Sequence, residues 1–170
     1  LQEMTYPDGE VLRYAYDSGG LVRAATGEKL GNEYPYVTRL EHDKFGQRVY
    51  LVSGNGVPTE YHYDADDRRL ERLTAGDFQD LSYAYDKVGN ILSLHNAVPV
   101  ALPKDFGGPV DQTFTYDALD RLTSATGEWR YAPNNTDRYS LTLSYDTIHN
   151  ILHKSQRHEV VGPGGAVIPQ

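Results

Sequence analysis

The chain has 170 residues, with 16 Lys and Arg against 24 Asp and Glu, which gives a formal net charge of −8. This acidic balance argues against a general nucleic-acid binder, which needs a basic surface, and against docking on an anionic membrane. The sequence has no Cys, which excludes thiol catalysis, disulfides and Cys-ligated zinc, and no apolar run approaches the roughly 18 residues that span a bilayer.

Tyrosine is unusually frequent, with 14 residues among 19 aromatic side chains that include four Phe and one Trp. Tyr favours strands and half-buried sheet faces, where the ring packs and the hydroxyl reaches water. The chain also holds 16 Gly and 9 Pro, which indicates many turns. The composition therefore favours an all-β chain with short connections.

Six segments repeat one pattern, Tyr-x-Tyr-Asp followed by a turn and a short apolar return. The second copy, Leu40-Glu41-His42-Asp43, is degenerate. The Asp residues that align the copies recur every 21 to 31 residues: Asp17, Asp43, Asp64, Asp86, Asp117 and Asp146. Such a period predicts a repeat architecture.

Each copy predicts a β-hairpin. In Tyr-x-Tyr both rings point to one face of a strand, and the Asp at the strand end can accept hydrogen bonds from the N–H groups that follow it. A residue shortly after the Asp is expected to take positive φ, as a tight hairpin requires. The residues in this role are Gly19, Gly46, Asp67, Gly89, Asp120 and His149, of which the three glycines are the best suited.

The links between copies also predict turns, as in Pro7-Asp8-Gly9 and Ser53-Gly54-Asn55-Gly56, so the whole chain is expected to form an antiparallel meander. We expect one repeat region over residues 1–158, with insertions at 95–112 and 129–139, and an extended tail or linker over 159–170. The first residue is Leu, and the end follows a Gly- and Pro-rich stretch. We therefore expect a piece of a longer protein.

The repeated Tyr-x-Tyr-Asp-x-x-Gly-Asn/Arg-Leu unit resembles the RHS, or YD, repeat. Members of that family include bacterial polymorphic toxins, the B and C components of insecticidal toxin complexes, and the animal teneurins. The resemblance covers roughly residues 5–155, and residues 83–94 and 114–127 match best and look most like the toxin-complex type.

The resemblance implies one long curved sheet of antiparallel hairpins that spirals into a hollow shell around a C-terminal toxin domain. Six hairpins give about twelve strands, too few to close a shell, so this chain would be a wall segment. The implied role is structural and non-enzymatic, without a cofactor, in a secreted bacterial protein. Its partners would be the rest of the shell, the enclosed toxin and other toxin-complex subunits. The Asp-Pro segment at which RHS toxins cleave themselves is absent, so neither protease nor toxin activity carries over.

Three chemical alternatives are weaker. A catalytic carboxylate is disfavoured, because an Asp that recurs in the same turn is better explained by the turn. His149 and His153 have the spacing of a helical metal pair but lie in and after a predicted turn. Asp64-Ala65-Asp66-Asp67 could attract calcium but lacks the Gly and terminal Glu of an EF-hand loop. The sequence therefore predicts neither a catalytic residue nor a metal site.

The alternative function is a cell-surface module that binds glycan or protein. Tyr and Trp side chains stack on sugar rings, and Trp129 in the second insertion is the candidate ligand contact. Packing of that insertion on the sheet would also explain Trp129. Asn134-Asn135-Thr136 fits a glycosylation acceptor, which matters only in a eukaryotic secretory pathway.

Overall fold

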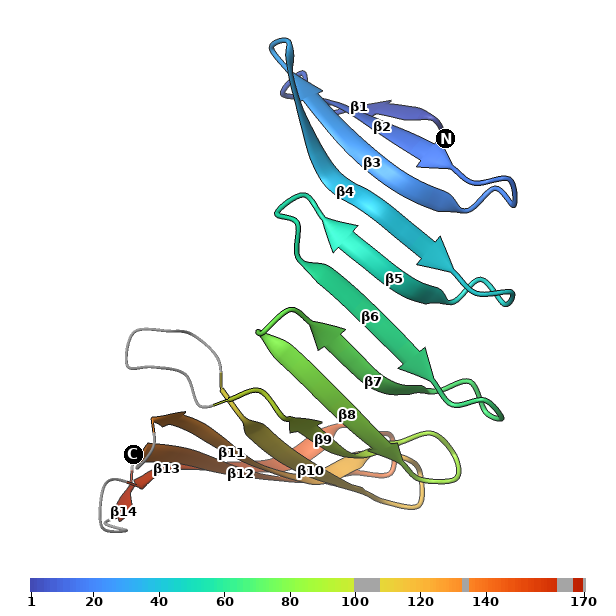
Figure 1. The fold of residues 1–170 in the computed structure, drawn as a ribbon. Helices are drawn as coiled ribbons and strands as arrows, with labels where there is room; N and C mark the ends of the chain where they lie inside the picture. The colour runs from blue at the N-terminus through green and yellow to red at the C-terminus, as the bar shows by residue number, and fades with distance from the viewer. Residues whose placement is uncertain (100–107, 133–134, 162–166, 170) are drawn as a thin grey trace. The chain divides into compact units, whose positions relative to one another are not determined.

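The structure is a computed structural model that describes residues 1–99, 108–132, 135–161 and 167–169. These residues form β-strands and turns, without a helix. They divide into two compact units, residues 1–76 and 77–170, which are described separately. The prediction of an all-β chain of repeated antiparallel hairpins is confirmed in both units (Figure 1).

The first unit holds seven strands, each antiparallel to the next along the chain. They are β1 (Glu3–Thr5), β2 (Val11–Tyr16), β3 (Val22–Lys29), β4 (Asn32–His42), β5 (Arg48–Ser53), β6 (Pro58–Tyr63) and β7 (Leu70–Ala75).

The second unit repeats this arrangement with seven strands in the same sequential order. They are β8 (Gln79–Tyr85), β9 (Ile91–Asn96), β10 (Val110–Tyr116), β11 (Leu122–Ala132), β12 (Asn135–Tyr145), β13 (Ile151–Val161) and β14 (Val167–Pro169).

Six hairpins, numbered 1 to 6 in chain order, correspond to the six sequence copies: β2/β3, β4/β5, β6/β7, β8/β9, β10/β11 and β12/β13. The short strands β1 and β14 flank them, which gives fourteen strands in the described residues rather than about twelve. In each hairpin the register shifts by one residue immediately before the Asp, as between Ala15 and Tyr16 in hairpin 1. This bulge belongs with a type I turn that is followed by one left-handed residue.

In two hairpins the residue with positive φ is not the one that the sequence pattern predicts. In hairpin 1 it is Gly20, with φ of 81°, and not Gly19, because the left-handed position is the third after Asp17 and Gly19 is only the second. In hairpin 3 the turn is one residue longer, so that Arg68, with φ of 64°, takes the position and not Asp67. The other four hairpins have positive φ at Gly46, Gly89, Asp120 and His149.

The insertions and the tail contain more strand than the sequence suggested. Residues 95–96 belong to β9 and 110–112 to β10, while 100–107 lie outside the described residues. Most of the 129–139 insertion lies in β11 and β12, so it lengthens hairpin 5 and the strand that follows rather than adding a loop. The expected boundary at residue 158 falls inside β13, and β14 pairs with Glu159–Val161.

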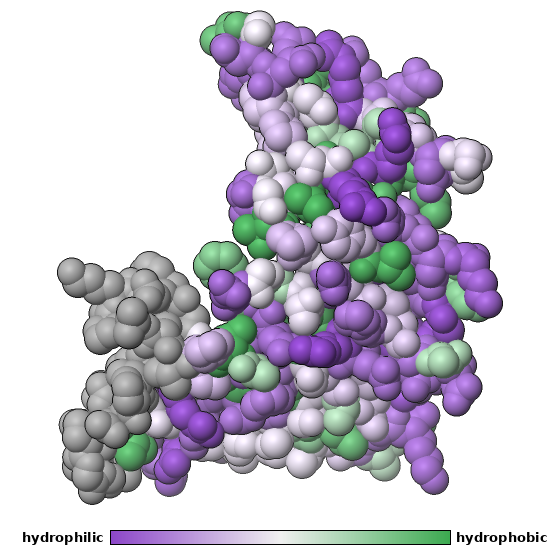
Figure 2. All heavy atoms as spheres, viewed as in Figure 1, coloured by the Kyte–Doolittle hydropathy of each residue, from purple (hydrophilic) through white to green (hydrophobic). Residues whose placement is uncertain are grey.

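Each unit is a single layer with two unlike faces. The paired rows Tyr14–Ala25 and Phe114–Ala125–Leu141 lie on what we call the tyrosine face, which carries the motif tyrosines. Burial is greatest there: Ala125 is 4% and Ala25 8% exposed. No large side chain of the described residues is fully buried, and hydrophobic groups form small separate areas on the side seen in Figure 2. The units are therefore stabilised by cross-strand packing rather than by a thick core.

Candidate functional site

The Asp at the turn recurs in all six hairpins, and all six carboxylates face the backbone of their own turn. Asp17 Oδ1 accepts hydrogen bonds from the N–H groups of Gly19 at 2.8 Å and Leu21 at 2.9 Å. The same pair of contacts, to the second and fourth residues after the Asp, recurs in four other hairpins. In hairpin 3, Asp64 Oδ1 instead binds the N–H groups of Asp66 and Asp67, both at 2.7 Å.

These contacts lower the pKa of five of the carboxyl groups: Asp43, Asp64, Asp86, Asp117 and Asp146. For Asp43, Asp86 and Asp117, burial is the largest single influence on the pKa and acts to raise it. Several hydrogen bonds to each carboxylate together outweigh burial, so the pKa is lowered. At Asp64 the N–H of Asp67 contributes most, and at Asp146 the side-chain amide of Asn150 does. The carboxylates are thus held ionised by their own turns.

The motif tyrosine before the Asp joins one hairpin to the hairpin before it. Tyr63 donates its hydroxyl hydrogen bond to the carbonyl oxygen of Arg48 at 2.9 Å. Tyr116 does the same to Ile91 at 2.9 Å, and Tyr145 to Leu122 at 2.8 Å. In each case the acceptor is the first residue of the preceding hairpin's return strand. We call the strip between two successive hairpins a seam.

A second contact crosses the same seams from the fourth residue after the Asp. Gln47 Nε2 donates to the carbonyl of Arg68 at 2.9 Å, and Arg121 Nη1 donates to the carbonyl of Asp146 at 3.0 Å. Asn90 Nδ2 lies 2.9 Å from Asp120 Oδ1. Each of these side chains belongs to one hairpin and reaches the turn of the next, so the turns are linked as well as the strands.

Arginines reinforce two of the seams. Arg68 donates to Asp43 Oδ2 and Gln47 Oε1 of the preceding hairpin, and its guanidinium lies 4.0 Å from the ring centre of Phe45. Arg121 forms an ion pair with Asp117 at 2.7 Å and stacks 4.7 Å from the ring centre of Tyr145. The seams are therefore tied by hydrogen bonds, charge and cation–π contact together.

The seam between hairpins 1 and 2 is different, because His42 stands where the other hairpins have the second tyrosine. Pairing of β3 with β4 covers Ala25–Lys29 and ends at Val37. A groove of about 600 Å³ follows, lined by residues that include Arg23, Ala24 and Leu40. His42 Nδ1 is buried and has no hydrogen-bond partner in the described part of the chain.

Sequence reasoning missed two glycines that accept a tyrosine ring. Gly27 pairs with Tyr34 across β3 and β4, and Gly127 pairs with Tyr139 across β11 and β12. A Cβ at Gly127 would overlap the Tyr139 ring, and one at Gly27 would lie 2.6 Å from Tyr34 Cε2. The signal was present, because Ala-Thr-Gly-Glu occurs in both places, at residues 25–28 and 125–128.

Trp129 lies on β11 and is 39% exposed, opposite Val110 on one side and Asp137 on the other. It lines a groove of about 230 Å³ together with Asp137 and His158. Asp137 Oδ2 is 3.3 Å from His158 Nε2, whereas Asp137 Oδ1 is buried without a hydrogen-bond partner among the described residues. The groove thus offers an aromatic surface beside an acceptor oxygen.

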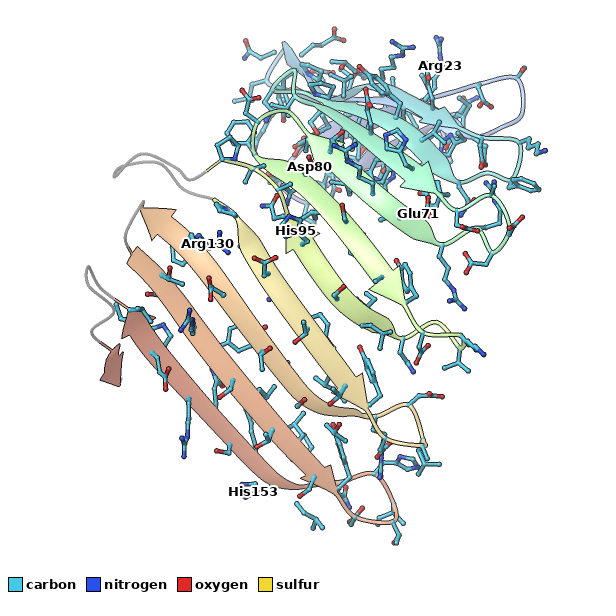
Figure 3. All side chains as sticks on the ribbon, turned by 60° about the horizontal axis from the view of Figure 1, so that its bottom comes forward. Arg23, Glu71, Asp80, His95, Arg130 and His153 are labelled. Atoms are coloured by element: carbon cyan, nitrogen blue, oxygen red, sulfur yellow. The ribbon has the colours of Figure 1, made fainter. Side chains whose placement is uncertain are left out.

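The opposite face of the second unit carries hydroxyls and paired charges. Thr113 and Thr126 hydroxyls lie 2.7 Å apart. His95 and Arg130, which Figure 3 labels on β9 and β11, both contact Asp111 on β10 between them. Arg130 also pairs with Glu128 at 3.1 Å. This polar face, as we call it, therefore presents largely compensated charge.

The weaker chemical candidates are not brought together. His149 lies in a turn with φ of 71°, while His153 lies on β13 opposite Ser144. The carboxylates at 64–67 bind their own turn, including Arg69 N–H at 3.0 Å from Asp67 Oδ1. In the described residues no group of three His, Asp or Glu side chains could hold a metal ion. The same residues include no helix long and apolar enough to cross a membrane.

Comparisons with known proteins agree with the repeat. No protein-family model matches the chain. It is 36% identical over 131 residues to toxin subunit YenC1 of Yersinia entomophaga and 34% identical over 131 residues to toxin subunit YenC2 of the same organism. Each match covers 70% of this chain but only 13% and 14% of the respective relative.

Solved structures are similar over 99% of the chain. A crystal structure of TcdB2–TccC3 without its hypervariable C-terminal region matches with a TM-score of 0.75 and 27% identity. A Tc holotoxin pore of Photorhabdus luminescens with a mutated TccC3 matches with a TM-score of 0.74 and 26% identity. The chain spans 9% of each of those chains.

Proposed function

We propose that this chain, which is an RHS/YD-repeat segment similar to toxin-complex subunits, forms part of the wall of a shell around a C-terminal toxin domain. One observation carries the proposal: the motif tyrosine repeatedly donates to the main chain of the preceding hairpin, as Tyr116 does to Ile91. Because the acceptor is a backbone carbonyl, the contact tolerates sequence change in the acceptor residue. Hairpins can then be added side by side without a separate core.

The two faces suit such a wall. Three of the motif tyrosines donate their hydroxyl hydrogen bonds to the neighbouring hairpin. The polar face has hydroxyls and charges that pair with one another. On the side seen in Figure 2, the hydrophobic groups of the described residues form small separate areas rather than a broad apolar surface that would hold an enclosed polypeptide tightly. In this proposal the six Asp residues serve the turns, and the segment itself performs no catalysis.

The proposed partners follow from the same reading. They are the remaining hairpins of the parent shell, the enclosed toxin domain and other toxin-complex subunits, and the proposed location is outside the bacterial cell. The similarity to YenC1 and to a Tc holotoxin structure supports this assignment.

Limited proteolysis of the full-length parent tests the proposal. We expect a protease-resistant C-terminal fragment that becomes sensitive when Tyr116→Phe and Tyr145→Phe are combined, because two seams then lose their hydroxyl contact. Tyr83→Phe is the matched control, since the Tyr83 hydroxyl makes no hydrogen bond within the described residues. A C-terminal fragment that is equally sensitive in all three proteins would argue against enclosure.

The groove beside Trp129 supports a second candidate, a site for a glycan. An indole face can stack on a sugar ring, and the buried Asp137 Oδ1 could accept a hydrogen bond from a sugar hydroxyl. We expect Trp129→Ala to abolish glycan binding, measured by titration calorimetry. Tyr50→Ala, on the other unit, should leave that binding unchanged. Absence of any glycan response in the unmodified chain would eliminate this candidate.

A further inference from the structure

The turn between β5 and β6 holds the one Asn-Gly pair of the sequence, Asn55-Gly56. Residues 54–56 are exposed, and Gly56 has a φ of 81°. A Cβ placed on Gly56 would meet no heavy atom within 4 Å apart from its own chain neighbours, so the space around this main chain is open. The turn therefore presents a side-chain amide and an unshielded glycine to water.

The side chain of Asn55 is turned toward the main chain that follows it. Its Oδ1 accepts a hydrogen bond from the N–H of Val57 at 3.0 Å, as in an Asx turn. This donor polarises the amide carbonyl and would stabilise negative charge on Oδ1 when a nucleophile adds to Cγ. Asn55 Nδ2 makes no hydrogen bond in the part of the chain that the structure describes, so no contact retains it as a leaving group.

The asparagines of the repeat turns lack this combination. Asn90 and Asn150 donate from Nδ2 to the carboxylates of Asp86 and Asp146, both at 2.9 Å. Each is followed by isoleucine, whose branched and rigid side chain crowds its own main-chain nitrogen. These two asparagines are therefore internal comparisons for Asn55 within the same molecule.

One hydrogen bond restrains the Gly56 nitrogen. Its N–H donates to the carbonyl oxygen of Ser53 at 2.9 Å, and this bond closes the turn. The nitrogen has to release that hydrogen bond before it can attack a neighbouring carbonyl. Opening the exposed turn leaves the pairing of residues 50–52 with 58–60 in place, so the opening is local and does not require unfolding of the unit.

We propose that Asn55 is a site of spontaneous covalent modification, at which the folded chain converts the side-chain amide to aspartate and isoaspartate. The main-chain nitrogen of Gly56 forms a bond to Cγ of Asn55, and the bond from Cγ to Nδ2 breaks. The proton of the Gly56 nitrogen leaves with the amide nitrogen as ammonia. Water then opens the resulting cyclic imide at either carbonyl, so the net reaction consumes a water molecule and releases ammonia.

Isoaspartate adds a methylene to the main chain of a turn that has no room for it. The N–H of Gly54 donates to the carbonyl oxygen of Tyr36 on β4 at 2.8 Å. A Cβ on Gly54 would overlap the carbonyl oxygen of Pro35, because the turn lies directly against β4. The isoaspartate product should therefore break the Gly54 contact, whereas the aspartate product, whose main chain is unchanged, should keep it.

Incubation of the folded 170-residue chain in heavy-oxygen water at neutral pH tests this inference. Peptide mass spectrometry should show loss of the original Asn55 peptide and appearance of products that carry heavy oxygen. The Asn90 and Asn150 peptides should keep their mass. Gly56→Asp should abolish the conversion, because its Cβ crowds the main-chain nitrogen. Asp tolerates positive φ, and the turn has space for that Cβ, so near-unchanged circular dichroism is expected.

Hydrogen exchange of the separated products tests the structural consequence, since the Gly54 amide should exchange faster in the isoaspartate form than in the aspartate form. Equal exchange in the two forms would overturn that consequence. Conversion of Asn55 no faster than that of Asn90, conversion only in chain unfolded by guanidinium, or equal conversion in Gly56→Asp overturns the modification site itself. None of these outcomes bears on the shell proposal, which depends on the seams and is tested by proteolysis.

Discussion

The hydroxyl of Tyr116 donates a hydrogen bond to the carbonyl oxygen of Ile91, 2.9 Å away, and so fastens hairpin 5 to hairpin 4. Tyr145 repeats the relationship toward Leu122, one hairpin further on. The tyrosine that defines the sequence motif thus acts on the neighbouring repeat, whereas the aspartate beside it acts on its own turn. The tyrosine therefore joins two hairpins, and the aspartate next to it stabilises the turn of its own hairpin.

Loss of this hydroxyl should weaken the seam without changing the ring packing. We expect Tyr116→Phe to lower the free energy of unfolding by about 0.5–1.5 kcal/mol, the ordinary net contribution of one hydrogen bond. Urea denaturation of the 170-residue chain measures the change. Tyr83→Phe, a half-buried ring without a hydroxyl contact in the described residues, should change the midpoint much less, and an equal change in both variants would refute the seam contact.

Each turn carboxylate should contribute separately to the thermal stability of the chain. Asp117→Ala removes the acceptor of the Leu119 and Arg121 N–H groups, so we expect a clear fall in melting temperature. Asp117→Asn keeps one carbonyl acceptor and should lose less. Asp66→Ala is the control, because this acidic residue in the turn of hairpin 3 donates from its backbone, but its carboxylate accepts no hydrogen bond within the described residues. A control as destabilised as Asp117→Ala would contradict the assigned role.

Stability should fall in acid because of these same groups. The pKa of five turn carboxyls lies below its ordinary value of 3.8 in the folded chain. Each therefore adds stability above its unfolded pKa, and this contribution is lost as the pH falls through the lower folded pKa. We expect the urea midpoint to decline below about pH 5, and Asp146→Asn to flatten that decline. A pH-independent midpoint would contradict it.

Alkaline pH should act on the first unit through Glu10. Its Oε1 accepts from Tyr34 at 2.8 Å and Tyr36 at 2.6 Å, and these hydrogen bonds raise the pKa of both phenols. The stability they provide is present below the ordinary phenol pKa of 10.0 and is lost as the pH rises through the raised folded pKa. Titration of tyrosinate absorbance should show two phenols moving to lower pH in Glu10→Gln, and an unchanged curve would count against this contact.

The glycine beneath Tyr139 should not tolerate a methyl group. Gly127→Ala would force the ring off the sheet, and we expect a cost of about 1–3 kcal/mol from overpacking, measured by urea denaturation. The double variant Gly127→Ala/Tyr139→Ala should recover part of that cost, because the ring that clashes is gone. Purely additive losses would show that the ring and the glycine do not interact.

The hairpins were predictable because their determinants are local. Asp117 accepts hydrogen bonds from the N–H groups of residues two and four positions on, so both partners lie within the same short stretch of sequence. The misplaced left-handed residue in hairpin 3 shows the limit: one extra turn residue moved it from Asp67 to Arg68, although Gly and Asp are favoured over Arg in that conformation.

The seams were not predictable from the same pattern. Tyr63, Tyr116 and Tyr145 reach acceptors that are 15, 25 and 23 residues earlier, a separation that depends on the length of each link. The sequence shows that Leu40-Glu41-His42-Asp43 is degenerate, but the groove beside Arg23, Ala24 and Leu40 depends on how β3 and β4 are placed and could not be predicted from it. Likewise Trp129 was placed in an insertion, whereas pairing with Asp137 puts it on a strand.

Electron cryomicroscopy of the full-length parent tests the central claim most directly. The account predicts a hollow particle in whose wall residues 1–161 lie as side-by-side hairpins, with separate density enclosed within. An open sheet, or a particle without an interior space, would contradict the assignment of this chain to a shell wall.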